Sequence, residues 1–427
     1  MHPADLSYLT AVSLAGALCR ALRRGLPEGW RQRLEARPPE DLPRGWVWVH
    51  AVSVGELLLA EGLLGRLRAR GHALHVTTGT PARLELLRRR LPDWDAGTGR
   101  VTGGAFPLDD PAGLAPFLHR PPAAFVALET ELWPNLLRSL EARGIPRAVV
   151  NGRLTPRSLA RGGGPWLRRA AARLSAVAAR DEASAEAFRA LGAPEVQLGG
   201  NLKADLPAPK PLHAGWHPLR AAWEGLPVVV VGNTVAGEEA LVLSAWRAAR
   251  ERHAGLRLVI APRQPRRFAE VAGLLAQAGL AFRRASEPWP EEAEAWRGTE
   301  LLLLDTLGEL AAAYAEGTVA LVGGGWRWEG GHNPLEPARF GLPVLVGPGY
   351  ANFGDLVEPL RAAGRLRVVA PEALPSALGE ALDAAPGLRP AQLSPLPGLP
   401  EALRGALDRT EAVLKKVLPD PMGGNRP

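Results

Sequence analysis

The chain has 427 residues, of which 46% are apolar and 22% charged, a composition that excludes a disordered chain. Its single cysteine, Cys19, excludes a disulfide framework, a cysteine-built zinc site and an iron–sulfur cluster. The formal charge of +7 lies in one half, because residues 1–200 carry 27 arginines against 19 acids, a balance of +8, and the remainder carries −1. That half is expected to meet an anionic membrane, a phosphorylated substrate or nucleic acid.

Residues 1–40 are expected to form a helical region. Leu6–Leu22 is mainly apolar, but its uncharged part ends at Cys19 and is shorter than the roughly 20 residues needed to span a bilayer. No lysine or arginine precedes it, which argues against a secretory signal. An interfacial helix at the cytoplasmic leaflet and an ordinary packed helix remain open; the first is favoured by the arginines that follow, Arg20, Arg23, Arg24, Arg31 and Arg33.

Beyond these residues, apolar runs typical of strands alternate with helical patterns. In residues 41–205 the alternation covers Trp46–His50, Leu57–Arg70, Ala73–Thr77, Ala82–Arg90, Ala123–Leu128 and Ala148–Val150. The proline-rich residues 206–226 predict a linker. In residues 227–418 the alternation of strand and helix patterns resumes and covers Val228–Val231, Glu238–Arg252, Arg257–Ala261, Arg267–Ala278, Leu301–Leu304, Thr318–Val322 and Pro343–Val346. We therefore expect an α/β protein with two doubly wound, Rossmann-like domains, and ligands at the carboxyl ends of their parallel strands, in the cleft between domains.

Acidic residues follow two of the first-half strands. Ser53 and Glu56 have the spacing of a capping box, and Glu56 is also a candidate general base whose ionised form the helix N-terminus favours. Glu129 and Glu131 come after Ala123–Leu128 and precede Trp133-Pro134-Asn135. They fit either a polar-ligand site or acids in the first turn of a helix.

In the second half, Asn233 and Thr234 follow a strand and fit either a phosphate-binding loop or a helix cap. Arg263, Arg266 and Arg267 follow the next strand and offer guanidinium groups to phosphates. Asp305 to Glu309, which includes Gly308, is a further strand-to-helix turn.

The stretch from Gly323 to Pro337 is the most unusual, because five glycines let a ligand approach the backbone closely. Its Asn333 and Glu336 fit a capping box, but capping does not explain the glycines, His332 and two tryptophans, so we expect a nucleotide site. No G-x-G-x-x-G dinucleotide fingerprint is present. Asp93-Trp94-Asp95 spells a D-x-D motif in a polar loop, and the nine histidines show no zinc-binding spacing, so no metal is expected.

Taken together and in this order, eight motifs between Trp46 and Val369 resemble the 3-deoxy-D-manno-octulosonic acid (Kdo) transferases of lipopolysaccharide biosynthesis. They are WVHAVSVGE, TTGTP, ALETELWPN, VVNGRLTPRS, GGNLKAD, DTLGEL, GGHNPLEPA and GPGYANFGD. The resemblance implies a metal-independent, inverting glycosyltransferase of the GT-B type, with a cleft between its two domains and no cofactor beyond its CMP-activated sugar donor. It also implies an N-terminal membrane-associating helix and a lipid A-like acceptor, an acylated and phosphorylated disaccharide.

The resemblance assigns roles to individual residues. Glu56 becomes the catalytic base. The acceptor side is shaped by Ser53, Glu129, Glu131, Asn135 and Arg153. The donor side comprises Asn201 and Lys203 near the sugar, together with Asn233, Thr234, Arg263, Gln264, Gly308, Glu309, Gly323, Gly324, His332, Asn333, Glu336 and Asn352.

This chain departs from the family on the donor side. At four donor-side positions the family usually shows the tripeptides Pro-Arg-His, Ser-Thr-His, Gly-Gly-Ser and Gly-Pro-His. In this chain the third residue of each tripeptide is replaced, and the replacements are, in the same order, Gln264, Val235, Gly325 and Gly349. Two alternatives therefore stay open: a related GT-B enzyme using a different nucleotide-sugar, as a transferase or an epimerase, and a non-catalytic protein of this fold. The expected location is the cytoplasmic membrane, with the protein peripheral or N-terminally anchored and facing the cytoplasm. No nucleic-acid partner is expected, because arginines spread over several helices define no groove.

Overall fold

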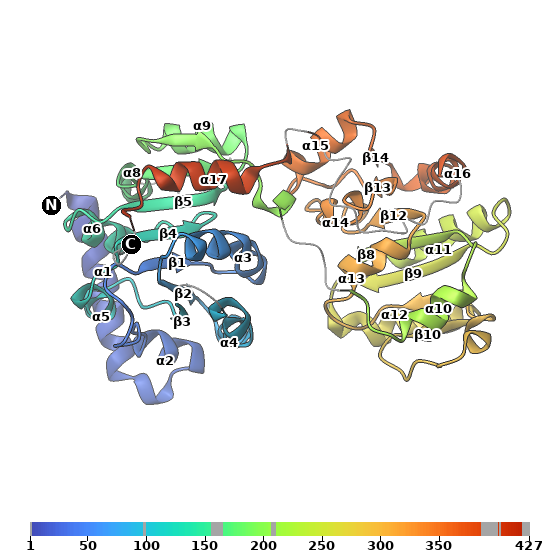
Figure 1. Ribbon diagram of the computed structural model, residues 1–427, viewed down its shortest axis with the longest axis horizontal. Coiled ribbons are helices and arrows are strands. Elements are labelled where there is room, and N and C mark those ends of the chain that lie inside the picture. The colour runs from blue at the N-terminus through green and yellow to red at the C-terminus, as the bar shows by residue number, and fades with distance from the viewer. Residues whose placement is uncertain are drawn as a thin grey trace, which may run out of the picture. The chain divides into compact units, whose positions relative to one another are not determined.

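The computed structural model of the protein describes residues 2–96, 100–154, 165–205, 211–385, 400 and 403–420. The end of VVNGRLTPRS and the start of the expected linker lie outside these residues. The chain divides into two compact units (Figure 1). The first unit comprises Met1–Leu206 with Arg404–Pro427, and the second comprises Pro207–Leu403.

The first unit is built on seven parallel strands in the order β3-β2-β1-β4-β5-β6-β7. Every residue of β1, β2 and β4 is buried, as expected of a parallel sheet covered on both faces. The strands are β1 (Val47–His50), β2 (Leu74–Thr78), β3 (Val101–Ala105), β4 (Ala124–Leu128), β5 (Arg147–Gly152), β6 (Ala176–Ala179) and β7 (Val196–Leu198).

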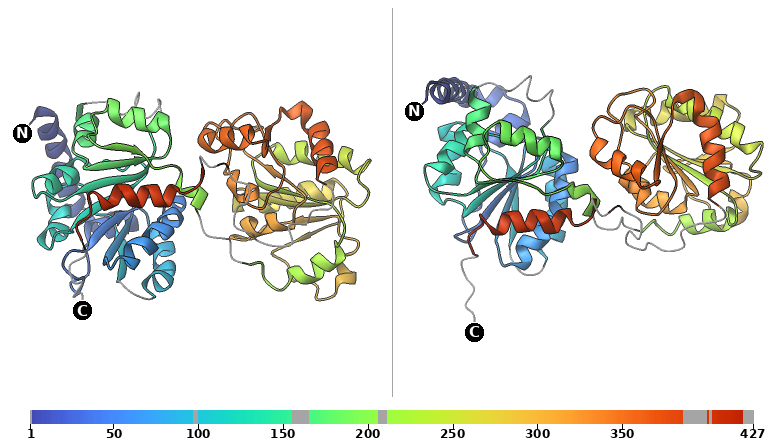
Figure 2. Two further views of the ribbon diagram at one scale, coloured as in Figure 1. Left: turned by 45° about the horizontal axis from the view of Figure 1, so that its top comes forward. Right: turned by 90° about the horizontal axis from the view of Figure 1, so that it is seen from above.

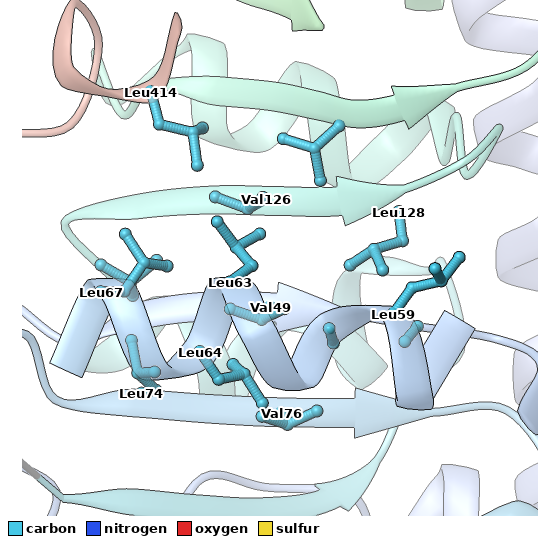
Figure 3. Close-up of a cluster of buried hydrophobic side chains, with 14 of the residues drawn as sticks. Val49, Leu59, Leu63, Leu64, Leu67, Leu74, Val76, Val126, Leu128 and Leu414 are labelled. Carbon is cyan, nitrogen blue, oxygen red and sulfur yellow. The ribbon is translucent and has the colours of Figure 1, made fainter. Parts of the chain in front are cut away.

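Helices pack on both faces of this sheet and enclose two apolar cores. In one core, Leu59, Leu63 and Leu67 of a single helix lie against Val49 and Val126 of the central strands (Figure 3). The helical elements that follow β1 are α3 (Val54–Ala69), α4 (Pro81–Asp95), α5 (Pro111–His119), α6 (Pro134–Glu141), α8 (Pro165–Ala172), α9 (Glu182–Ala190) and η2 (Leu202–Asp205).

The C-terminal helix α17 (Ala406–Lys415) also belongs to the first unit, which corrects the expectation that the second domain runs to residue 418. Its residue Leu414 is fully buried in the core of Figure 3. The backbone N–H of Leu407 donates to Asp205 at 2.6 Å, and Arg66 of α3 pairs with Asp408 at 2.8 Å. In both views of Figure 2, α17 lies against the first unit.

The N-terminal region forms α1 (Pro3–Ala21), η1 (Arg23–Gly25) and α2 (Glu28–Leu34). Helix α1 lies beside α5, α6 and α8 (Figure 1) and is held there by polar contacts. Its buried Asp5 pairs with Arg169 and Arg173, each at 2.7 Å, and Arg20 forms a bidentate pair with Asp110. No helix in the described part of the chain is long and apolar enough to cross a membrane.

The second unit has a sheet of seven parallel strands in the order β10-β11-β9-β8-β12-β13-β14. Its strands are β8 (Val228–Thr234), β9 (Arg257–Pro262), β10 (Phe282–Arg284), β11 (Leu301–Leu303), β12 (Val319–Val322), β13 (Val344–Val346) and β14 (Leu366–Val368). Its α-helices are α10 (Trp216–Ala222), α11 (Glu238–Arg250), α12 (Phe268–Gln277), α13 (Leu310–Ala313), α14 (Leu335–Ala338), α15 (Gly354–Ala362) and α16 (Leu374–Ala384).

The prediction of a linker over residues 206–226 is wrong for its second part. Helix α10 occupies Trp216–Ala222, and Trp216 and Trp223 are at most 3% exposed in the core of the second unit. The indole N–H of Trp223 also donates to the carbonyl of Thr299 at 3.2 Å. Two large aromatic side chains therefore make this segment part of a folded unit, although its prolines suggested otherwise.

Each sheet reverses its strand order beside the first strand of its unit. In the first sheet β1 lies between β2 and β4, and in the second β8 lies between β9 and β12. At such a reversal the loops leaving the two neighbouring strands diverge to opposite faces, which opens a crevice at the carboxyl edge. These two edges, β1/β4 and β8/β12, hold most of the residues that the sequence analysis singled out.

Candidate functional site

At the β1/β4 edge of the first unit, two loops bring acidic side chains together. Glu56 lies in the first turn of α3, directly after β1, and Glu129 and Glu131 follow β4. Because β1 and β4 are paired parallel strands, the two loops start at neighbouring points of the same carboxyl edge. The carboxyl groups of Glu129 and Glu131 are close enough to interact electrostatically, and Glu56 interacts with both.

Glu56 forms the capping box that its spacing predicts. Its carboxylate accepts hydrogen bonds from the backbone N–H of Val52 at 2.7 Å and of Ser53 at 3.2 Å, while Ser53 Oγ accepts from the Glu56 N–H at 3.0 Å. Burial raises the pKa of Glu56, and these backbone donors oppose the increase. The cap thus fixes the orientation of a buried carboxylate, and capping does not exclude a role as a base.

Glu131 is held by the tryptophan two residues later. The indole N–H of Trp133 donates to Glu131 Oε2 at 3.0 Å, and burial, followed by the charge of Glu56, raises the pKa of Glu131 to about 7. Glu129 has a φ of +57°, which is uncommon for a residue with a side chain.

The described residues contain three non-glycine positions with a positive φ: Glu129, Asn151 and Asn233. All three lie at the carboxyl end of a strand, after β4 or within the last residues of β5 and β8. Strained backbone of this kind collects at functional sites, where the surrounding structure holds it in place. Two of the three, Glu129 and Asn233, lie at the strand-reversal edges, which supports these edges as sites.

Two residues of this edge were missed by the sequence analysis. His50 is the last residue of β1, fully buried, and its Nε2 lies 3.8 Å from Glu131 Oε2. Arg33 of α2 donates to the carbonyl oxygens of Phe106 and Pro107 and lies over the ring of Trp133 at 5.5 Å. A polar residue that ends an apolar strand was the available signal for His50, whereas no local pattern marks Arg33.

The other expected acceptor-side residues differ in their exposure. Asn135 is only 2% exposed, and its side-chain amide donates to the Asp109 carbonyl at 2.6 Å while its backbone N–H donates to the Asp109 carboxylate. Asn135 is therefore a structural residue at the start of α6 and does not offer its side chain to a ligand. Arg153 follows β5, and its carbonyl accepts a hydrogen bond from the Thr130 hydroxyl.

Asn201 and Lys203, expected near the donor sugar, belong to the first unit. They follow β7 at the same carboxyl edge of the sheet as the acidic residues. The side chain of Asn151 accepts from the Leu202 N–H at 3.0 Å, and that of Asn201 accepts from the Lys203 N–H at 3.0 Å. These bonds fix the segment that carries the lysine.

At the β8/β12 edge of the second unit, a buried carboxylate organises the glycine-rich loop. Glu238 begins α11 and accepts hydrogen bonds from three backbone N–H groups, those of Val235 at 3.1 Å, Gly324 at 2.7 Å and Trp326 at 2.9 Å. A Cβ on Gly323 would meet that carboxylate at 2.7 Å, so glycine is required there. The fully buried Thr234 donates to Glu239 and has no hydroxyl face open to a ligand.

Only part of the expected arginine cluster is available to an anion. Arg263 is exposed and close enough to His332 to lower the pKa of its imidazole, which burial, the larger cause, brings to about 4. Arg267, by contrast, is buried in ion pairs with Glu239 and Glu270, so it is structural. The Gln264 side chain accepts a hydrogen bond from Arg266 at 2.8 Å.

The remaining donor-side residues form two groups. Asn333 caps the start of α14 by accepting from the Leu335 N–H at 3.2 Å, and its amide lies 3.4 Å from Glu336. Asn352 lies beside the loop, since a Cβ on Gly330 would meet its amide at 2.6 Å. Glu309 accepts hydrogen bonds from Trp216 and Thr306, which ties the Gly308 turn to α10. Within the described residues, no group of three or more acidic, histidine or cysteine side chains is placed to hold a metal ion.

Comparison with known proteins identifies close relatives of this chain. Residues 28–206 match the family described as 3-Deoxy-D-manno-octulosonic-acid transferase (kdotransferase). The 3-deoxy-D-manno-octulosonic acid transferase of Bordetella pertussis is 36% identical over 342 residues, and that of Haemophilus influenzae is 34% identical over 349 residues; each alignment covers 78% of both proteins.

Among solved structures, trehalose-6-phosphate synthase matches 87% of this chain and 98% of its own, with a TM-score of 0.53 and 13% identity. At that identity the likeness concerns the fold alone. It agrees with the two doubly wound units and with the GT-B class expected from the sequence.

Proposed function

Because the chain belongs to the 3-deoxy-D-manno-octulosonic acid transferase family and is a glycosyltransferase of lipopolysaccharide biosynthesis, we propose that it transfers Kdo from CMP-Kdo to a lipid A-type acceptor. The observation that carries this proposal is the oriented, buried carboxylate of Glu56 at the β1/β4 edge, beside Glu129 and Glu131.

In the proposed reaction Glu56 removes the proton of an acceptor hydroxyl as its oxygen attacks the anomeric carbon of the donor. The bond between that carbon and the phosphate oxygen breaks, CMP leaves with the electron pair, and the anomeric configuration inverts. Glu56 suits this role because backbone N–H groups of Val52 and Ser53 hold its carboxylate in one orientation. We expect the reaction to need no metal ion and no cofactor.

On the donor side we assign the leaving phosphate to Arg263 and the nucleoside to the loop around Gly324, Asn333 and Glu336. The exposed guanidinium of Arg263 lies near His332, whose lowered pKa keeps that imidazole neutral at pH 7. A fixed cation beside the departing phosphate stabilises charge that develops in the transition state. We also assign Lys203 to the carboxylate of the sugar.

We place this reaction at the cytoplasmic face of an anionic membrane. Leu14, Leu18 and Leu22 are four residues apart along and just beyond α1 and are 56–67% exposed, so they lie on one face as an apolar stripe. Arg23, Arg24 and Arg31 are exposed next to it, as is Trp30. An apolar stripe with arginines and a tryptophan at its end is typical of a helix lying in a membrane interface.

The test is transfer by the purified enzyme from CMP-Kdo to a tetra-acylated disaccharide bisphosphate, with product detected by mass spectrometry. CMP-Kdo turnover to a glycosylated lipid is expected without added metal and in the presence of EDTA. Transfer only from a UDP-sugar, or conversion of a nucleotide-sugar without acceptor, would assign the protein to a different GT-B activity. Absence of any nucleotide binding would indicate a non-catalytic protein.

The membrane assignment is tested by co-sedimentation with vesicles containing anionic phospholipid. Exchanging Leu14 and Leu18 for glutamine removes two exposed side chains that make no core contact, and it should reduce binding by about tenfold per leucine. Leu307, which is 78% exposed on the second unit, provides the matched control, since Leu307→Gln should leave vesicle binding unchanged. Equal loss in both variants would contradict the assignment.

A further inference from the structure

His50 is fully buried at the end of β1, and the proposed reaction does not use it. Its ring stacks on Phe106 with centroids 3.9 Å apart, and its Nδ1 lies 3.0 Å from the carbonyl oxygen of Thr77. Its Nε2 is buried and has no hydrogen-bond partner among the described residues. A buried polar atom without a partner is costly, so Nε2 is expected to acquire one when the site functions.

The hydrogen bonds around Thr77 determine which ring nitrogen carries the proton. The hydroxyl and the carbonyl oxygen of Thr77 both lie 3.0 Å from His50 Nδ1, and the hydroxyl also accepts from the Trp48 indole at 2.8 Å. A carbonyl oxygen only accepts, and His50 Nδ1 must therefore donate to it. Burial lowers the pKa of His50 to about 3, so the ring is neutral and Nε2 presents a lone pair.

That lone pair faces Glu131. The distance from His50 Nε2 to Glu131 Oε2 is 3.8 Å, and a small rotation of the glutamate side chain brings the two atoms within hydrogen-bond range. The lone pairs of an ionised carboxylate would repel the lone pair of the imidazole. A protonated carboxyl group would instead donate to Nε2 and satisfy it.

We propose that His50 is a positioning residue that keeps Glu131 as a neutral carboxylic acid beside the ionised Glu56, an inference that rests on the proposed function for the role of Glu56. The two acids of the β1/β4 edge then have different tasks. Glu56 takes the proton from the acceptor hydroxyl, and Glu131 contacts the acceptor without adding negative charge next to a phosphorylated substrate. Separating the protonation of two nearby carboxyl groups is a common device of acid–base enzymes.

The other groups that face Glu131 act in both directions. Glu56 of α3 and Glu129 of the same loop favour the neutral acid, as does burial, whereas Arg33 of α2 and the Trp133 indole favour the ionised form. Their balance leaves the pKa of Glu131 at about 7. A hydrogen bond from the neutral acid to His50 raises it further, which extends the neutral form across physiological pH.

The protonation state is measured directly by infrared difference spectroscopy of the whole enzyme, in which Glu131→Gln identifies the carboxylic-acid band of Glu131. In the wild type that band should persist to pH 7 or above. In His50→Phe, which keeps the stacking on Phe106 and removes the acceptor, it should disappear about one pH unit lower. His75→Phe is the matched control, because His75 is equally buried on the neighbouring strand and bonds Thr102.

Transfer kinetics supply the second readout. Wild-type kcat/KM for the acceptor should fall as pH rises through the pKa of Glu131, and His50→Phe should shift this decline about one unit lower while His75→Phe does not. Glu131→Gln, whose amide can donate to His50 as the neutral acid does, should lose the decline and keep activity within about tenfold, whereas Glu131→Ala should lose about a hundredfold.

An ionised Glu131 in the wild type at pH 6, or a Glu131→Gln variant as inactive as Glu131→Ala, would overturn the proposal. If His50→Phe does not fold, the infrared band of the wild type and the Glu131→Gln profile still decide. If the wild type transfers no Kdo, the proposed function fails while the infrared titration still tests the protonation of Glu131.

Discussion

The two strand-reversal edges share a topology but present different chemistry. At β1/β4 the functional groups are side chains: the carboxyl groups of Glu56 and Glu131, set among Phe106, Trp133 and His50. At β8/β12 the loop offers mainly backbone, because Gly325 packs against the backbone of Gly347, just after β13, and the buried Glu238 holds the loop by three backbone N–H groups.

The difference between the two edges matches the roles proposed for them. A reacting hydroxyl needs a side chain whose pKa can be adjusted, and burial among aromatic rings provides that adjustment. A nucleotide needs close approach and fixed dipoles, which glycines provide once a carboxylate has immobilised their backbone. Under the proposed function, the carboxyl edge carries out proton transfer in one unit and binds the nucleotide in the other.

The largest effect is expected from Glu56→Gln. The variant keeps the size of the side chain but loses the base, so kcat should fall about a thousandfold while CMP affinity, measured by calorimetry, stays within twofold. Glu61→Gln on the same helix is the control and should retain normal turnover. Turnover of Glu56→Gln within tenfold of the wild type would show that the β1/β4 edge does not carry the proton transfer.

The second edge is tested by Glu238→Gln. Losing the charge that binds three backbone N–H groups should destabilise the protein by about 3 kcal/mol in urea denaturation and weaken CMP binding by about tenfold. Glu239→Gln breaks the buried pair with Arg267 and should cost a similar free energy with little change in CMP affinity. If Glu238→Gln and Glu239→Gln lose the same CMP affinity, both glutamates act only through the stability of the protein.

The glycines of the second edge give a smaller, steric prediction. A Cβ at Gly349 would lie 2.1 Å from the Trp328 carbonyl oxygen, so Gly349→Ala should destabilise the protein by about 1–3 kcal/mol. Gly354→Ala, with open space around the position in the first turn of α15, should be neutral or slightly stabilising. The contact also shows that histidine, which the family usually has at position 349, does not fit this loop arrangement. A stable Gly349→Ala variant would contradict the close packing of the two loops.

The smallest effect is expected from Ser53→Ala. Loss of the cap should cost about 1 kcal/mol of stability. Ser53 also lowers the pKa of Glu56, so its removal raises that pKa further above the ordinary glutamate value. Because the base must be ionised, activity is lost as pH falls through this pKa, and the acid limb of kcat/KM should move to higher pH in the variant. If the acid limb of kcat/KM does not move, the Ser53 cap does not control the ionisation of the catalytic base.

The fold was predictable where strands are continuous apolar runs. Val228–Val231 and Ala123–Leu128 were expected and are β8 and β4, extended by a few residues or shortened by one. Five strands were missed: β3, β6, β7, β10 and β14. Of these, β3 (Val-Thr-Gly-Gly-Ala) and β6 (Ala-Val-Ala-Ala) consist mostly of small residues whose burial comes from neighbouring strands and helices. The return of α17 to the first unit has no local signal at all.

The site was predictable residue by residue but not as an arrangement. Glu56 and Glu131 could be singled out by their position after strands, and the pairing of β1 with β4 explains why they meet. The relation of His50 to Glu131 needed the same long-range pairing, and Thr234 and Asn135 proved structural because their burial depends on Glu239 and Asp109. The catalytic and binding roles of Glu56 and Glu131 stay predictions for the experiments above.

The position of α17 has a consequence for biosynthesis. Val413 and Leu414 complete the core beneath β1 and β4, yet the ribosome makes them after the whole second unit. The first unit therefore emerges with part of its apolar core uncovered and can close only once α17 has been made. During that interval the nascent chain exposes a surface of the kind that chaperones bind, and premature termination before residue 404 would leave it open permanently.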